Sequence, residues 1–171
     1  HIIIQPSIAL SQEQQIVDTQ KLVDFFSVRG IPYILGVNEY NIIYDIKKNL
    51  SPDILFYPQP YNGYYPRQLS YNYFYSKLLC YHPYAFWIGN GSWSYDQPLH
   101  RMAWKLFYPC LLHKNDLRLY YRKGENVEVV GFSSADEFLY KSHQYRWKQQ
   151  TVSKKKVIWA PHFTFLAGGL V

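Results

Sequence analysis

Hydrogen-bonding side chains follow two short apolar runs in the middle of this chain. The runs span residues 54–56 and 78–81, and each one stops at prolines and polar residues. In open α/β sheets the ligand lies beyond the carboxyl ends of the parallel strands. The alternative for each residue is a structural role, because tyrosines and prolines at strand ends also pack and form turns. The expected binding rim consists of Gln59, Pro60, Tyr61, Asn62, His82 and Tyr84.

Two histidines have a sequence position that suits proton transfer. His82 and His162 each stand at the end of an expected strand, beside a proline. The imidazole pKa lies near neutral pH, so such a residue can take the proton of a hydroxyl group. The alternative is a histidine that is hydrogen-bonded into a loop. The six histidines show no metal-ligand spacing and the chain has no glycine-rich phosphate loop, so we expect neither a metal nor a cofactor.

The apolar pattern alternates between strand-length runs and helix-length segments. We expect an amphipathic helix that is capped by Ser11 and ends at Gly30. Residues 89–98 are rich in Gly, Asn and Ser, which predicts a loop. Further helices are expected at residues 41–50, at 68–77, at 97–121 with a break at Pro109, and from Ser134 onward. The expected strands are residues 2–4, 31–37, 54–57, 79–84, 127–131 and 157–160.

Strands that alternate with helices predict an α/β fold. We expect a Rossmann-like, mainly parallel sheet with helices on both faces. Its central strands should include residues 2–4, 31–35, 54–57 and 127–130. At 171 residues, of which 48% are hydrophobic, the chain is long enough for one well-buried domain. Residues 147–156 have the composition of a polar, basic link.

The composition leaves several kinds of partner open. The net charge of +6 is compatible with nucleic acid, an anionic membrane surface or a phosphorylated substrate. The basic residues do not alternate with aromatic ones as in nucleic-acid-binding modules, so nucleic acid is disfavoured. Cys80 and Cys110 lie in apolar runs, which predicts free thiols in a reducing compartment. No apolar run has the length of a membrane span.

Four segments, in order along the chain, resemble the CDP-glycerol glycerophosphotransferase family. These segments are PDILFYPQPY, CYHPYAFW, VEVVGFSSADEF and KKKVIWAPHFTF. The family comprises teichoic-acid-type polymerases and primases, together with related bacterial polysaccharide proteins. The resemblance covers most of residues 52–165. It implies a GT-B architecture, in which two Rossmann-like domains flank a cleft that holds the active site.

The resemblance also implies how this chain divides. Residues 1–153 would be the N-terminal, acceptor-side domain, and residues 154–171 would begin the crossing into a C-terminal, donor-side domain. We therefore expect the sequence to be a piece of a longer protein. His82 matches the strand-end histidine that acts as general base in the family, and His162 lies near a second histidine region. The chain lacks the Gly-Thr-Pro-Leu-Lys sequence that follows the family's base.

Two classes of function remain open from the sequence. The first is the acceptor half of a transferase, with Gln59, Tyr61, Asn62 and Tyr84 at the acceptor. Its partners would be a CDP-glycerol-like donor, held by the missing domain, and a lipid-linked or saccharide acceptor. Such an enzyme would be cytoplasmic, with residues 154–156 available to an anionic inner membrane face. The alternative is a non-catalytic α/β domain that binds a saccharide, nucleic acid or a protein.

Overall fold

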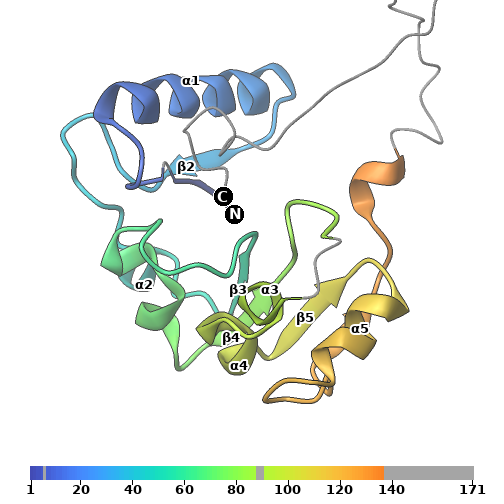
Figure 1. Cartoon of the computed structure of the whole chain (residues 1–171). Coiled ribbons are helices and arrows are strands. Elements are labelled where there is room, and N and C mark those ends of the chain that lie inside the picture. The colour runs from blue at the N-terminus through green and yellow to red at the C-terminus, as the bar shows by residue number, and fades with distance from the viewer. Residues whose placement is uncertain (6, 88–90, 137–171) are drawn as a thin grey trace, which may run out of the picture. The chain divides into compact units, whose positions relative to one another are not determined.

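A computed structural model describes residues 1–5, 7–87 and 91–136 of the chain (Figure 1). The chain divides into two units, His1–Ala135 and Asp136–Val171, and nearly all of the second unit lies outside the described residues. The first unit is an α/β fold in which every paired strand runs parallel to its neighbour. The prediction of a Rossmann-like, parallel α/β fold is therefore confirmed.

The strands form two sheets within the described residues. Strands β1 (Ile2–Ile4) and β2 (Tyr33–Leu35) pair in one small sheet. The second sheet has four strands in the order of the chain: β3 (Ile54–Tyr57), β4 (Leu78–Tyr81), β5 (Lys105–Tyr108) and β6 (Val127–Val129). The expectation that residues 2–4, 31–35, 54–57 and 127–130 share one sheet is wrong, and β6 is an edge strand.

The first helix forms where its capping residues predict it. Helix α1 (Gln12–Val28) follows β1, and the Ser11 hydroxyl accepts a hydrogen bond from the Gln14 amide at 3.3 Å. Gly30 has a φ of +62°, a left-handed conformation that ends the helix and that glycine adopts without a steric penalty. Helix α2 (Ile46–Asn49) is shorter than the expected helix over 41–50 because the Asp45 side chain caps it at the Lys48 amide.

The segment expected to be a helix over 68–77 consists of two 3₁₀ turns, η1 (Arg67–Leu69) and η2 (Tyr71–Phe74). Ser70 interrupts them with an extended backbone, and its side chain accepts a hydrogen bond from the Asn72 amide. Tyr71 and Phe74 are fully buried, so tertiary packing of these rings replaces the regular helix.

The largest correction concerns residues 97–121, for which the sequence predicted one broken helix. The structure has a short helix α4 (Pro98–Met102), the strand β5, and a helix α5 (Leu111–Leu117). β5 lies between β4 and β6, and the burial of Leu106 and Tyr108 fixes it there. The expected loop over 89–98 also contains a helical turn, α3 (Ser92–Tyr95).

Two further expectations lie partly or wholly beyond the described residues. The helix expected from Ser134 is represented by the 3₁₀ turn η3 (Ser133–Ala135). The expected link over 147–156 and the expected strand over 157–160 lie outside the described residues.

The two faces of the four-stranded sheet differ in burial. Leu79 and Leu106 lie on the side that is almost fully buried. On the opposite side the rings of Phe56 and Phe107 stack at 5.8 Å, and Phe56 is 64% exposed. Right-handed crossovers between strands in consecutive order place every connection on the same face. The core therefore forms on that one face, with Tyr57, Tyr81 and Tyr108 at the strand ends. For these four strands the expectation of helices on both faces of the sheet is wrong.

Candidate functional site

Three neighbouring strands end in buried tyrosines. Tyr57, Tyr81 and Tyr108 are the last residues of β3, β4 and β5, and each is at most 6% exposed. The segment after β4 continues along the end of β3: the His82 amide donates to the Tyr57 carbonyl, and the Tyr84 amide donates to the Pro58 carbonyl, each at 3.1 Å. The segments that follow β3 and β4 therefore lie side by side at the carboxyl edge of the sheet, as expected for parallel strands.

A buried hydrogen-bond network holds the tyrosine side chains at the ends of β4 and β5 in place. The Gln97 amide donates to His100 Nδ1 at 3.1 Å, so the proton of this imidazole is on Nε2. His100 Nε2 lies 3.0 Å from the Tyr108 hydroxyl and donates to it. The Tyr108 and Tyr81 hydroxyls also share a hydrogen bond, so the network continues from His100 to the end of β4.

The network is uncharged at neutral pH. Burial lowers the pKa of His100 to about 4, and the nearby Asp96 carboxylate opposes this only in part. Burial also raises the pKa of Tyr81 and of Tyr108 well above the usual phenol value, with neighbouring tyrosines adding to the effect. These groups therefore position other residues and donate hydrogen bonds, and they do not act as bases.

A small cavity of about 10 Å³ opens beside these strand ends. A cavity of this size has room for about one water molecule or one ligand hydroxyl group. The Ser94 side chain, which is 6% exposed, lines it, and no described group forms a hydrogen bond to the Ser94 hydroxyl oxygen. A buried hydroxyl group without a hydrogen-bond partner destabilises the fold. We therefore expect a polar atom of a water molecule or a ligand to bind next to Ser94. The lining residues are Pro60, Tyr61, Tyr81, Pro83, Tyr84, Ala85, Trp87, Ser94 and Tyr108.

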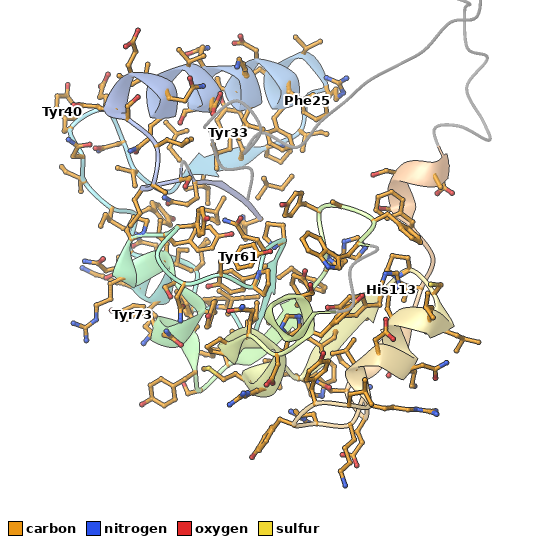
Figure 2. All side chains as sticks on the ribbon, viewed as in Figure 1. Phe25, Tyr33, Tyr40, Tyr61, Tyr73 and His113 are labelled. Carbon is orange, nitrogen blue, oxygen red and sulfur yellow. The ribbon has the colours of Figure 1, made fainter. Side chains whose placement is uncertain are left out.

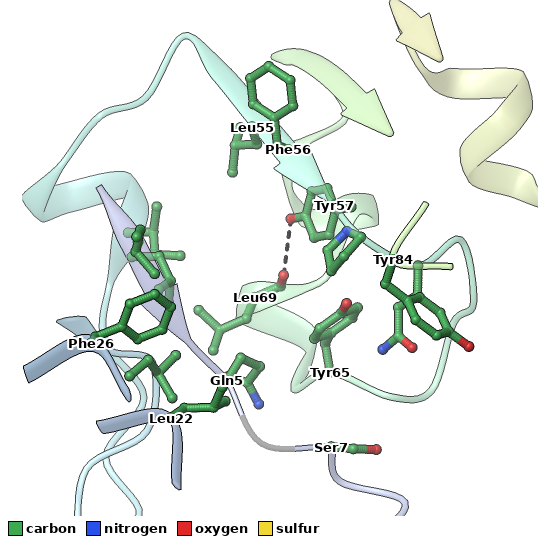
Figure 3. Close-up of a pocket in the computed structure, with 16 residues that line it drawn as sticks. Gln5, Ser7, Leu22, Phe26, Leu55, Phe56, Tyr57, Tyr65, Leu69 and Tyr84 are labelled. Atoms are coloured by element: carbon green, nitrogen blue, oxygen red, sulfur yellow. Dashed lines mark hydrogen bonds between the residues drawn. The ribbon is translucent and has the colours of Figure 1, made fainter. Parts of the chain in front are cut away.

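A second cavity has a volume of about 450 Å³ (Figure 3). Its lining is mostly apolar and comes from β1, from Leu22 and Phe26 of α1, and from β3. Tyr57 forms part of the lining, and its hydroxyl donates to the Leu69 carbonyl at 3.0 Å. The volume lies in the range of small-molecule pockets. Tyr84 lines both cavities, so the polar rim and the apolar cavity share this side chain.

The structure brings together some of the residues that the sequence singled out. Tyr61 and Tyr84 lie together at the small cavity, and burial followed by the proximity of Tyr84 raises the pKa of Tyr61. Gln59 lines the apolar cavity and forms a hydrogen bond to Tyr65. Asn62 lines neither cavity, because its Oδ1 accepts a hydrogen bond from Asn72 Nδ2 at 3.2 Å.

The two predicted catalytic histidines have different outcomes. His82 follows β4 directly and is partly buried, as expected for a strand-end residue, but it lines neither of the two cavities. His162 lies outside the described residues.

Sequence reasoning missed one pair of side chains. Cys110 follows β5, and its Sγ lies 3.1 Å from Nδ1 of His113. His113 belongs to α5 and is labelled in Figure 2. His113 Nε2 lies 2.6 Å from the carbonyl oxygen of Trp87. The signal was present as Cys-x-x-His directly after an apolar run, but the expected helix over 97–121 concealed the strand end.

Comparison with known proteins finds no matching family model, no matching curated protein and no matching solved structure. Among the described residues no cluster of three or more His, Cys, Asp or Glu side chains could hold a metal ion. None of the helices in that part of the chain is long and apolar enough to cross a membrane. The resemblance to the CDP-glycerol glycerophosphotransferase family therefore remains a prediction.

Proposed function

We propose that this chain is the acceptor-binding half of a bacterial glycerophosphotransferase- or glycosyltransferase-like enzyme of surface polysaccharide synthesis. The observation that carries the proposal is the apolar cavity of about 450 Å³ that shares Tyr84 with the strand-end rim. The parallel α/β fold and the four resembling segments support the same assignment.

The two cavities suit the two parts of a lipid-linked acceptor. An apolar chain removed from water between β1, α1 and β3 gains about 25 cal/mol for each Å² of buried apolar surface. The polar end of the acceptor then lies at Tyr61 and Tyr84, with the Ser94 hydroxyl and the Tyr81 O–H as hydrogen-bonding groups. A tyrosine rim suits this task because each ring offers an apolar face and a polar tip.

The chemistry proposed for the whole enzyme is the transfer of an alditol phosphate or a sugar to an acceptor hydroxyl. In phosphate transfer the hydroxyl attacks the β-phosphorus of a CDP-alditol donor, which a further domain binds. His82 takes the hydroxyl proton, and the released nucleotide is CMP. Positioning the two substrates in line accounts for most of the rate enhancement in such reactions. The enzyme would work in the cytoplasm, at the inner membrane face.

Binding of a prenyl-linked acceptor analogue tests this assignment. We compare glycerol 3-phosphate with its farnesyl ester by isothermal titration calorimetry. Phe26→Trp should fill part of the cavity and weaken binding of the farnesyl probe at least tenfold. Phe25→Trp is the matched control, because Phe25 is the neighbouring residue of α1 and is not part of the cavity lining. Equal affinities for the two probes, or equal effects of the two substitutions, would contradict the proposal.

A further inference from the structure

The Cys110–His113 pair has the geometry of a nucleophile and its base. A backbone carbonyl only accepts hydrogen bonds, so His113 Nε2, at 2.6 Å from the Trp87 carbonyl oxygen, must carry a proton. In the neutral imidazole Nδ1 is then unprotonated and faces the Cys110 thiol at 3.1 Å. A nucleophile, a base and a third group that orients the base are the arrangement found in covalent catalysis by cysteine.

The surroundings hold the base in place, and the nucleophile is the less buried of the two residues. His113 is 2% exposed, and the rings of Tyr108 and Phe86 each lie 5.3 Å from its ring. Cys110 is only partly buried. It also stands two residues after β5, an inner strand, at the edge of the sheet where parallel α/β proteins bind their ligands.

The other uses of a cysteine find less support. The only other cysteine of the chain, Cys80, is fully buried in β4, so it cannot serve as a resolving thiol for a disulfide. No metal-binding cluster includes Cys110 within the described residues. The two residues that follow the sulfur, Leu111 and Leu112, are 68% and 66% exposed, which offers an apolar surface beside the thiol.

We propose that Cys110 is a nucleophilic thiol that His113 activates, and that it accepts an acyl group from an acyl thioester. The thiol proton moves to His113 Nδ1 as the sulfur attacks the thioester carbonyl carbon. The new sulfur–carbon bond forms, the bond to the leaving thiolate breaks, and His113 returns the proton to that thiolate. The products are an acylated Cys110 and one free thiol. This inference does not rest on the transferase proposal.

Intact-mass spectrometry of the full chain with octanoyl-coenzyme A tests the inference. We expect one octanoyl group per chain, removed by neutral hydroxylamine and mapped to Cys110. Cys80→Ser should leave the rate unchanged and Cys110→Ser should abolish the adduct. His113→Asn should slow acylation about tenfold or more, since an ordinary thiol is only a few per cent thiolate at pH 7.

A second measurement covers the case in which His113→Asn disturbs the fold. The wild-type chain is alkylated with iodoacetamide in its native state and in urea, and Cys110 should react faster in the native state. A native rate no higher than the rate in urea would overturn the activation of Cys110. Fast alkylation without octanoyl transfer would overturn the acyl thioester as its substrate.

Discussion

At the scale of single residues, the buried His100 should make the free energy of unfolding depend on pH. It is buried, neutral and hydrogen-bonded on both ring nitrogens, and burial lowers its pKa from 6.5 to about 4. The unfolded chain therefore binds more protons than the folded chain between these two pH values. The free energy of unfolding should fall as the pH falls through this window, by roughly 3 kcal/mol in all.

Urea unfolding at a series of pH values from 7 to 4 measures this loss. The matched variant is His100→Asn, which removes the titrating group and should show a smaller decrease over the same window. An NMR titration in which His100 changes its charge near pH 6.5 would contradict the assignment.

His82 carries the proposed base function, and its substitution has a distinct expected result. In the proposed transferase, His82→Ala should lower kcat by about two to four orders of magnitude, the usual contribution of a general base. Tyr84→Phe and Asn62→Ala should have milder effects. Circular dichroism should show an unchanged fold, because the His82 backbone amide, rather than its side chain, makes the described bond to Tyr57. A near-normal kcat would remove the assignment and leave His162 as the candidate.

Residue types and strand ends predicted only part of the candidate site. Tyr61 and Tyr84 were found because polar residues that follow apolar runs are visible in the sequence. Ser94, Tyr108 and His113 were not found, because their roles depend on β5 and on contacts between residues up to 26 positions apart. Such pairings are set by tertiary packing, which local patterns do not encode.

At the scale of elements, Gly36 sets how closely the small sheet approaches η1. A Cβ atom at this position would lie 2.9 Å from Gln5 Oε1, 3.0 Å from Leu69 Cδ1 and 3.1 Å from Ile3 Cγ2. All three distances are shorter than ordinary van der Waals contacts, so Gly36→Ala should force these side chains to move. We expect a destabilisation of about 1 to 2 kcal/mol.

A double-mutant cycle in chemical denaturation measures the origin of this loss. Leu69→Ala removes one of the three crowded atoms, so the cost of Gly36→Ala should be smaller in the Leu69→Ala background. Strictly additive free energies of unfolding would show that the strain lies elsewhere.

Elements with strong local signals were predictable. Ser11 and Gly30 mark both ends of α1, and β3 is bounded by prolines, so both elements form as expected. The segment Lys105–Tyr108 has only four residues and lies among helix-favouring neighbours, so its strand conformation is stabilised by pairing with β4 and β6. Short inner strands of this kind depend on their partners more than on intrinsic propensity.

At the scale of the whole molecule, the distribution of positive charge predicts binding to an anionic membrane surface. Residues 154–156 form the one lysine cluster of the sequence, and each cation near an anionic surface contributes about 1 kcal/mol. We expect this protein to co-sediment with vesicles that contain an anionic lipid and to dissociate from them as salt is raised. Replacement of the three lysines by glutamine should weaken this association. Co-sedimentation that is independent of salt and of anionic lipid would count against an electrostatic attraction.

A second prediction for the whole molecule is that this chain alone does not catalyse the transfer reaction. Transfer to a hydroxyl requires the donor and the acceptor to be held in line, and the pre-organisation of two substrates supplies about 7 to 11 kcal/mol of the barrier reduction. The rim and the apolar cavity offer sites for an acceptor, while the sequence contains no glycine-rich loop for the donor phosphates. We therefore expect the isolated chain to bind the acceptor analogue without turning over. Incubation with CDP-glycerol and a lipid-linked acceptor should release no CMP above background. CMP release by the isolated chain would show that its own residues hold both substrates.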